Sequence, residues 1–229
     1  MKVLVACEFS GVVRESFAAL GYNAWSCDVL PTEDRFNAKH LQCDVLTILD
    51  QGWDLIIAHP PCTYLTNAGV RHLHESVTSP RGNRAKVFGT ERMEAMKDAA
   101  RFFLALWNAP TQHICIENPI PHSYAREIIG DYTQLIQPWQ FGHGETKATC
   151  FWLKNLPPLM PTHRRDDLFC APEPSERVAR VHLMAPGPNR WKERSRTFTG
   201  IAKAMAEQWG SAITKNCACG QIVVDRNGR

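Results

Sequence analysis

Short apolar runs that alternate with helix-like patterns are the feature that most constrains the fold of this chain. Residues 3–7, 55–58 and 113–116 are such runs, and their lack of polar alternation is typical of strands buried on both faces. Residues 12–20 instead repeat apolar side chains at helical spacing and are followed by Gly21, a residue type that often ends helices. Strands that alternate with helices predict an α/β fold, in which a mainly parallel sheet carries helices on both faces.

The rest of the chain fits this arrangement. Further strands are expected at 23–27, just before Asp44, near 133–137 and near 148–153. Thr90 is the expected N-cap of a long helix whose core face would be formed by Met93, Met96, Ala100, Phe103 and Trp107. A helical turn is expected at 46–51 and a helix at about 200–212, whereas 155–196 is rich in Pro, Arg and His and is expected to be irregular.

Length and composition favour one soluble domain over residues 1–229. The chain is 44% hydrophobic and 21% charged, has no apolar run of about 18 residues that would span a membrane, and lacks a signal-peptide pattern. Its nine cysteines are scattered and odd in number, which does not fit a disulfide framework. We therefore expect a cytoplasmic protein with reduced cysteines, ending in a mobile tail at residues 214–229.

The net charge of +3 is unevenly distributed. Residues 69–92 carry five Lys or Arg against two acids, and residues 160–196 carry eight against five. Basic loops of this kind favour contact with a polyanion, although solvated surface loops give the same pattern.

The candidate functional residues follow the ends of predicted strands. They are Glu8, Asp28, Asp44, Cys62 and Glu117. The carboxyl ends of parallel strands meet at one edge of a sheet, where the loops form the usual binding crevice. We therefore expect these side chains to lie close together, although more than a hundred positions separate the first from the last.

Asp28 and Asp44 suggest a nucleoside cofactor. Asp28 lies twenty residues after Glu8 at the first strand's end, near the spacing at which an acid binds ribose hydroxyls. The turn CEFSGVV holds only Gly11 and lacks the G-x-G-x-x-G pattern that cradles a pyrophosphate, which favours a cofactor without phosphates, such as S-adenosylmethionine. The cofactor's amino-acid end would meet the backbone of residues 9–11, and Asp44 would bind its adenine. Ordinary strand-end or capping acids are the alternative for both aspartates.

Cys62 ends the stretch WDLIIAHPPC, in which an apolar strand meets two prolines. Pro60 and Pro61 fix the backbone and remove two donors, so the strand stops and Cys62 is held on a stiff turn. A thiolate is a strong nucleophile, and the basic stretch downstream is expected to favour this ionised form. A buried, inert cysteine is the alternative, but burial alone does not explain the prolines. His59 is interpreted as a packed histidine rather than a catalytic base.

The stretch CIENPIP supplies an acid from another strand end. Desolvation is expected to raise the pKa of Glu117, so that this group could hold or donate a proton near neutral pH. Asn118 offers both a donor and an acceptor. A cysteine that attacks an aromatic carbon needs an acid to protonate a ring nitrogen, and Cys62 and Glu117 would provide this pair.

These motifs resemble those of the DNA (cytosine-5)-methyltransferase family, over most of the chain. The family's Pro-Pro-Cys nucleophile corresponds to residues 60–62, its Glu-Asn pair to Glu117 and Asn118, and its last motif to TFTGIAKAMAEQW. The resemblance implies a Rossmann-like, S-adenosylmethionine-dependent methyltransferase fold in a short, phage-type member. The cofactor-binding residues that it implies are Glu8, Phe9, Gly11, Asp28, Val29, Asp44, Pro60, Thr199 and Gly200.

The resemblance also implies a reaction on DNA, expected to be double-stranded. A cytosine is flipped out of the duplex, Cys62 attacks carbon 6, and Glu117 binds nitrogen 3 and the exocyclic amine. Carbon 5 then takes the methyl group from S-adenosylmethionine and loses its proton, which releases Cys62. The DNA-binding residues expected in the basic loops are Arg71, Arg81, Arg84, Lys86, Arg164 and Arg165.

The chain departs from the family in three places, one of which is Pro119, where a valine commonly follows the Glu-Asn pair. Lys147 stands where the family usually has an arginine that contacts the base oxygen, and an ammonium lacks the planar fork of a guanidinium. The target-recognition region is reduced to residues 155–196, inserted before the last motif. Sequence specificity is therefore expected to be low, to cover a very short site or to come from a partner.

Three other functions remain open from the sequence. An amino-group methyltransferase would have Asp or Asn before Pro-Pro and an aromatic residue after it, where this chain has His59 and Cys62. A non-catalytic DNA-binding relative and the same ring chemistry on single-stranded DNA, RNA or a nucleotide are the others. Cys217 and Cys219 are separated by one residue, which is not typical of a zinc site, and no metal is expected.

Overall fold

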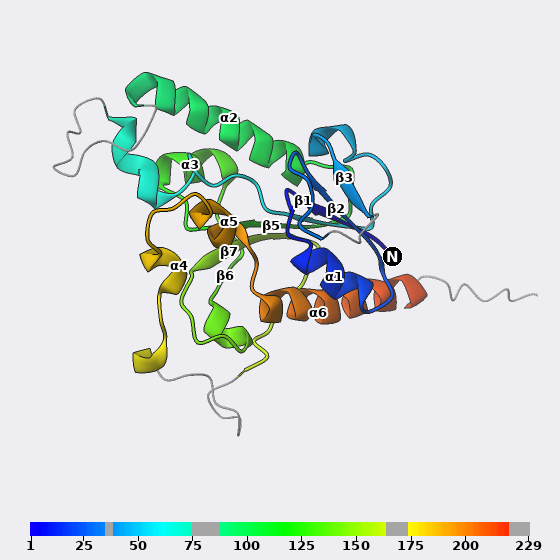
Figure 1. Ribbon diagram of the computed structural model, residues 1–229. Coiled ribbons are helices and arrows are strands. Elements are labelled where there is room, and N and C mark those ends of the chain that lie inside the picture. Colours follow the sequence, from blue (N-terminus) through cyan, green and yellow to red (C-terminus); the bar gives the residue numbers. More distant parts are fainter. Residues whose placement is uncertain (35–38, 75–87, 164–173, 220–229) are drawn as a thin grey trace, which may run out of the picture.

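The computed structural model describes residues 1–34, 39–74, 88–163 and 174–219, the last four of them by backbone alone (Figure 1). Within these ranges, seven strands form one sheet in the order β3-β2-β1-β4-β5-β7-β6. The strands are β1 (Lys2–Ala6), β2 (Asn23–Asp28), β3 (His40–Gln42), β4 (Leu55–Ala58), β5 (His113–Asn118), β6 (Gln134–Ile136) and β7 (Thr149–Lys154).

Strand β7 is the one strand of this sheet that runs against the others. The pairs from β3 through β5 are parallel, whereas β7 is antiparallel to both β5 and β6. The start of β7 therefore lies at the edge of the sheet where the parallel strands end. This topology confirms the expected fold class, an α/β, Rossmann-like fold with a mainly parallel sheet.

Helices cover both faces of the sheet. Figure 1 shows α1 (Val12–Ala18) beside α6 (Thr199–Cys219) on one face, and α2 (Gly89–Trp107) with α3 (Ser123–Ile129) on the other. Strand β1 contributes to both layers, because Val3 and Val5 pack in the cluster with α1 and α6 while Leu4 and Ala6 pack in the cluster with α2. Burial on both faces explains why this strand lacks polar alternation.

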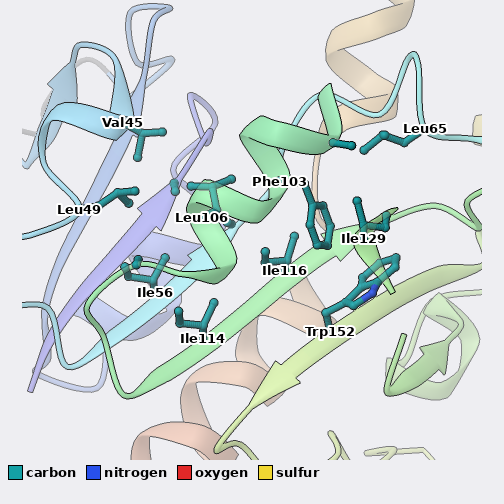
Figure 2. Packing of buried hydrophobic residues seen from close by; sticks show 14 of the residues in the cluster. Val45, Leu49, Ile56, Leu65, Phe103, Leu106, Ile114, Ile116, Ile129 and Trp152 are labelled. Carbon is teal, nitrogen blue, oxygen red and sulfur yellow. The ribbon is translucent and has the colours of Figure 1, made fainter. Parts of the chain in front are cut away.

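The core under α2 shows how the helix is held on the sheet. Figure 2 shows Phe103 and Leu106 of α2 over Ile114 and Ile116 of β5, with Trp152 of β7 beside them. The rings of Phe103 and Trp152 meet edge to face, with centroids 5.0 Å apart. Apolar burial of this extent fixes α2 on the sheet.

The structure corrects several sequence-based expectations. Helix α2 begins at Gly89 with Phe88 as its cap, so Thr90 lies inside the helix and is not the N-cap. Helix α3 was not expected. The stretch 155–196 is not wholly irregular, since its described part contains η4 (Pro174–Glu176), α4 (Arg180–Leu183) and α5 (Arg190–Ser195).

The last helix is longer than expected. Helix α6 continues to Cys219, past the start of the expected tail at residue 214, and residues 220–229 lie outside the described ranges. Three further 3-10 helices are η1 (Val45–Thr47), η2 (Asn67–Leu73) and η3 (Pro138–Phe141). None of the helices in the described ranges combines the length and apolar character that crossing a bilayer requires.

Candidate active site

Two neighbouring strand ends carry Cys62 and Glu117. Ala58, the last residue of β4, pairs in parallel register with Ile116 of β5. Glu117 is the next residue of β5, and the Pro-Pro turn that leads to Cys62 follows the end of β4. Asn118 joins the two ends, because its Nδ2 donates a hydrogen bond to the carbonyl of Pro60 at 3.3 Å. Asn118 is buried, and the structure gives it and Pro60 a positioning contact within the protein.

The loop after Cys62 is fastened to the segment after β5. The carbonyl of Cys62 accepts hydrogen bonds from the amides of Leu65 and Thr66, which closes a tight turn. The amide of His122 donates to the carbonyl of Leu65 at 3.0 Å, and Thr66 forms an antiparallel bridge with Pro121. The cysteine turn and the segment after Glu117 are therefore held together by backbone hydrogen bonds.

Arg92 of α2 fastens the same loop from the other side. Its side chain is buried, its Nη2 donates to the carbonyl of Thr63 at 3.2 Å, and its guanidinium lies 5.0 Å from the ring centre of Tyr64. Gly69 allows this approach, since a Cβ there would lie 2.3 Å from Arg92 Nη2. The turn that carries Cys62 is thus held by a helix buried in the core.

The Glu117 carboxylate is bound by two side chains that the sequence analysis did not assign to the site. Nδ1 of His59 lies 2.9 Å from Oε2 of Glu117, and Oγ1 of Thr197 donates to the same oxygen at 3.3 Å. Burial alone would raise the pKa of Glu117, but His59, Lys147 and Thr197 lower it to about 2. The expectation of a raised pKa is therefore wrong, because it counted desolvation without these partners.

Lys147 reaches the site because β7 is antiparallel. It lies just before this strand, and its Nζ donates to the carbonyl of Arg196 at 3.3 Å. Its charge lowers the pKa of both Glu117 and Cys62. Lys147 was expected at the site from its position relative to a motif, and the fold brings it to the same sheet edge as Glu117.

The Cys62 thiol does not show the electrostatics that the sequence predicted. Burial raises its pKa above the usual 9.0, and the opposing charges of Lys147 and Arg194 do not cancel that effect. The expected low pKa is therefore wrong, and the side chain is a protonated thiol at neutral pH. Within the described ranges, the cations that lower the pKa of Cys62 come from the start of β7 and from α5.

Glu8 is occupied by the helix that follows it. Its Oε1 accepts the amide of Val13 at 2.7 Å, and its Oε2 accepts the amide of Arg14 at 3.2 Å. These are free amides at the start of α1, so the Glu8 carboxylate caps the helix N-terminus. Gly11 precedes α1 with a φ of 75°, and a Cβ there would lie 2.5 Å from Arg14 Nη2. Glu8 and Gly11 therefore both shape the first turn of α1 through contacts inside the protein.

Asp28 and Asp44 lie at the ends of β2 and just beyond β3. Oδ1 of Asp28 accepts the amide of Leu30 at 2.9 Å, and burial raises the pKa of Asp28. Oδ1 of Asp44 accepts the amide of Leu46 at 3.0 Å and caps η1, which is the capping role left open by the sequence. Each carboxylate has further acceptor capacity. Val29, next to Asp28, is 70% exposed.

The chemistry of this edge suits an adenosine-containing cofactor. Two carboxylates with remaining acceptor capacity, Asp28 and Asp44, can receive hydroxyl and amino donors. Phe9, which follows β1, is buried and packs against Trp191 of α5, with ring centroids 5.6 Å apart. Asp28 and Asp44 could therefore hold such a cofactor, whereas Glu8 supports the start of α1.

The expected last motif lies beside the site, but its glycine has a packing role. Gly200 lies in the first turn of α6, where its amide donates to Nε2 of His143 at 2.9 Å. A Cβ on Gly200 would lie 1.9 Å from the carbonyl oxygen of Phe141. Thr199 begins the helix and is exposed. Thr197, two positions before Thr199, contacts the site through Glu117.

The segment from α5 to Thr197 is held against the segments that follow β1 and β2. Arg196 pairs with Glu33, which follows β2, and Lys192 lies 4.0 Å from the same carboxylate. Together with the contact between Trp191 and Phe9, these pairs fix the end of the expected recognition region against the loop after β2.

Most of the expected DNA-binding residues fall outside the described ranges. Arg71 is exposed on η2, and its Nε donates to His72 Nε2 at 3.3 Å. The residues outside the described ranges are Arg81, Arg84, Lys86, Arg164 and Arg165. No group of three or more metal-ligating side chains occurs among the residues that the structure describes.

Comparison of the sequence with protein-family models finds no match, and comparison with curated proteins finds none. Among solved structures, the chain is similar to a protein described as a prophage-encoded DNA modification methyltransferase of E. coli, with 13% identity and a TM-score of 0.40 over 67% of this chain. It is also similar to the Entamoeba histolytica methyltransferase EhMeth (14%, TM-score 0.44, 72% of this chain) and to S. pombe Dnmt2 methyltransferase (15%, TM-score 0.39, 67%). The matches cover 46%, 55% and 48% of those chains, respectively, so this chain spans about half their length.

Proposed function

We propose that this protein is an S-adenosylmethionine-dependent methyltransferase that modifies carbon 5 of cytosine in DNA. The observation that carries the proposal is the coupling of Cys62 and Glu117 at adjacent strand ends, where the charge of Glu117 acts on the Cys62 thiol. A nucleophile and a carboxyl group that share one environment suit attack on one carbon of a pyrimidine and recognition of a nitrogen of the same ring. Glu117 and Cys62 are the catalytic residues of this proposal.

The proposed step begins at carbon 6 of cytosine. The thiol is protonated at rest, so its S–H bond breaks and the proton passes to solvent water as the sulfur of Cys62 forms a bond to carbon 6. Glu117 binds nitrogen 3 and the exocyclic amine, so that the electron pair displaced from the ring double bond is available at carbon 5. After methylation, carbon 5 loses its proton, the bond to sulfur breaks, and the aromatic ring is restored.

Two cations would support the sulfur during this step. Lys147 and Arg194 lower the pKa of Cys62, which means that they stabilise the thiolate relative to the thiol. This stabilisation is greatest when negative charge develops on sulfur, and it therefore favours the transition state over the resting thiol. Lys147 would also contact the base from the position of the family's arginine.

S-adenosylmethionine, when bound, supplies an electrophilic methyl group. Asp28 would orient it through the ribose hydroxyls, Asp44 through the adenine amino group and Phe9 through its ring. Gly11 would keep the first turn close to the amino-acid end of the cofactor. The remaining expected contacts are Glu8, Val29, Pro60, Thr199 and Gly200, of which Glu8, Pro60 and Gly200 act through the protein contacts described above.

DNA is the proposed substrate, with a single methyltransferase domain over residues 1–229 and a short recognition region at 155–196. The described end of that region lies at the site, because Arg194 acts on Cys62 and Thr197 binds Glu117 just beyond it. A flipped base would therefore be contacted by the same segment that recognises its surroundings. Arg71 and the basic residues at 81, 84, 86, 164 and 165 are the proposed phosphate contacts.

Transfer of a tritiated methyl group from S-adenosylmethionine tests the proposal. The full chain, its Cys62→Ala variant and a Cys150→Ala control would be compared on double-stranded DNA, single-stranded DNA and RNA. We expect label on double-stranded DNA with the full chain and the control, and none with Cys62→Ala. Digestion to nucleosides should give 5-methylcytosine, and bisulfite sequencing should give its sequence context.

The alternatives give different outcomes. Label recovered as N4-methylcytosine would indicate an amino-group methyltransferase. Binding of DNA without label would indicate a non-catalytic module, and preferential labelling of single strands or RNA would change the substrate while keeping the ring chemistry.

A further inference from the structure

His59 is placed beside the acid of the proposed reaction by the turn that also carries the nucleophile. It lies directly after β4 and before the two prolines, and its amide donates to the carbonyl of Ala6 at 2.9 Å. Its Nδ1 lies 2.9 Å from Oε2 of Glu117, and the two side chains are only 12% and 11% exposed. This is a largely buried ion pair between adjacent strand ends.

The charged groups around His59 lie at the ends of β1 and β5 and at the start of β7. Glu117 at the end of β5 and Glu8 after β1 favour the imidazolium, while Lys147 before β7 opposes it. Burial lowers the pKa of His59, but the two carboxylates raise it to a net value above its usual 6.5. The buried Nε2 of His59 has no hydrogen-bond partner within the described part of the chain. Among the described residues, the ring therefore has Glu117 as its hydrogen-bonding partner.

A pair of this kind is not explained by stability. Buried ion pairs contribute little net stability compared with apolar side chains of similar volume, because both charges lose their hydration. The pair does change the protonation of the site, because Glu117 without a cationic neighbour would take up a proton at a higher pH. With His59, the proton of the resting pair is on the imidazole and the carboxyl group is ionised.

Resting on the proposed function, we propose that His59 is a positioning residue that stores the proton which Glu117 delivers to nitrogen 3 of the target cytosine. The N–H bond of the imidazolium breaks as an O–H bond forms on Glu117, and the carboxyl group donates its proton to nitrogen 3. His59 is then neutral. When the bond between sulfur and carbon 6 breaks, nitrogen 3 returns the proton and the ion pair is restored, so this cycle consumes no proton.

The test compares pH profiles of methyl transfer for the wild type and His59→Asn. An Asn amide can still donate to Glu117 from near the Nδ1 position, but it carries no titratable proton. Ionisation of Cys62 affects both proteins and cancels in the ratio of their rates. The ratio of wild-type to variant rate is expected to rise with pH, by about tenfold per unit, up to the pKa of His59 and to be level above it.

Thr197→Val is the matched control. It removes the other hydrogen bond to Oε2 of Glu117 and leaves the proton on His59, so the ratio of wild-type to Thr197→Val rates should stay level with pH. His59→Gln is a second variant without a titratable proton, for use if His59→Asn does not fold. If the ratio of wild-type to His59→Asn or His59→Gln rates does not change with pH, the proposed role of His59 is wrong, whereas the proposed function still stands. Absence of methyl transfer by the wild type would instead overturn the proposed function.

Discussion

Nδ1 of His59 lies 2.9 Å from Oε2 of Glu117, so the residue before the Pro-Pro turn and the acid of the neighbouring strand form one charged unit. The pair explains why Glu117 is ionised although it is buried. It also links the two strand ends that carry the proposed chemistry. This relationship has consequences for stability that do not depend on any substrate.

The ion pair predicts a pH window of maximal stabilisation. The pKa of Glu117 falls from 4.5 to about 2 on folding, so its contribution is complete above 4.5 and is lost as pH falls towards 2. The pKa of His59 rises above 6.5, so its contribution is complete below 6.5 and is lost as pH rises through the folded value. We expect His59→Asn to lower the free energy of unfolding by about 3 kcal/mol between these limits, and by less at pH 9. Urea unfolding at several pH values measures this difference, and an equal loss at pH 5.5 and pH 9 would contradict it.

The raised pKa of Cys62 predicts slow alkylation at neutral pH. Reaction with iodoacetamide, followed by peptide mass spectrometry, should accelerate as pH rises, because the thiolate is the reactive form. Lys147→Met removes a charge that lowers this pKa and should slow the reaction about fivefold at pH 8. Lys154→Met is the control, since Lys154 binds the carbonyl of Trp107 at the other end of β7. Equal rates for the wild type and Lys147→Met would show that Lys147 does not act on the sulfur.

Arg92 is predicted to control the position of Cys62. Arg92→Lys loses the hydrogen bond to Thr63 and the planar contact with Tyr64, so the cysteine turn should shift. A small displacement of a reacting group is costly, and we expect kcat of methyl transfer to fall about tenfold or more with little change in KM for S-adenosylmethionine. Arg101→Lys, on the exposed side of the same helix, should retain wild-type kcat. An unaltered kcat in Arg92→Lys would show that the contacts of Arg92 do not control the position of Cys62.

Gly200 is predicted to be required for packing. An alanine there would bring its Cβ to 1.9 Å from the carbonyl oxygen of Phe141, which forces α6 away from η3. We expect a loss of about 1–3 kcal/mol in the free energy of unfolding. Gly144→Ala is the control, because no atom lies within 4 Å of a Cβ at that position. Thermal unfolding compares the two, and similar melting temperatures would rule out the steric role of Gly200.

The sequence predicted those parts of the fold and site that depend on neighbouring residues. Apolar runs gave the central strands, and Leu55–Ala58 forms β4 with the expected bounds. The topology rule for strand ends then brought Cys62 and Glu117 to one edge without any knowledge of packing. Helix α3 was missed because its N-cap is His122, whose side chain accepts from the amide of Ala125, and histidine is not among the usual capping residues.

The pKa values of Glu117 and Cys62 depend on contacts between residues that are far apart in the sequence. A local sequence pattern does not reveal such contacts. Thr197 is 80 positions from Glu117, and Arg194 lies in a stretch that the sequence suggested was irregular. Because the partners of Glu117 were unknown, desolvation alone predicted the wrong direction for the pKa of Glu117. For Cys62 the expectation counted nearby cations and left out the burial that raises the pKa of the thiol. His59 had a local signal, its position before Pro60, but that position identifies a site residue only when the side chain is known to face Glu117.

A covalent trap tests the central claim most directly. Release of Cys62 requires carbon 5 to lose a proton, and fluorine at that carbon cannot leave as a cation, so DNA with 5-fluorocytosine should hold the enzyme after methyl transfer. The proposal predicts a complex that survives denaturation, forms only with S-adenosylmethionine and double-stranded DNA, and carries the methylated base on the peptide with Cys62. It also predicts no such complex with Cys62→Ala. Methyl transfer to cytosine by wild-type protein without any covalent complex on 5-fluorocytosine DNA, or a complex formed through another residue, would contradict the claim.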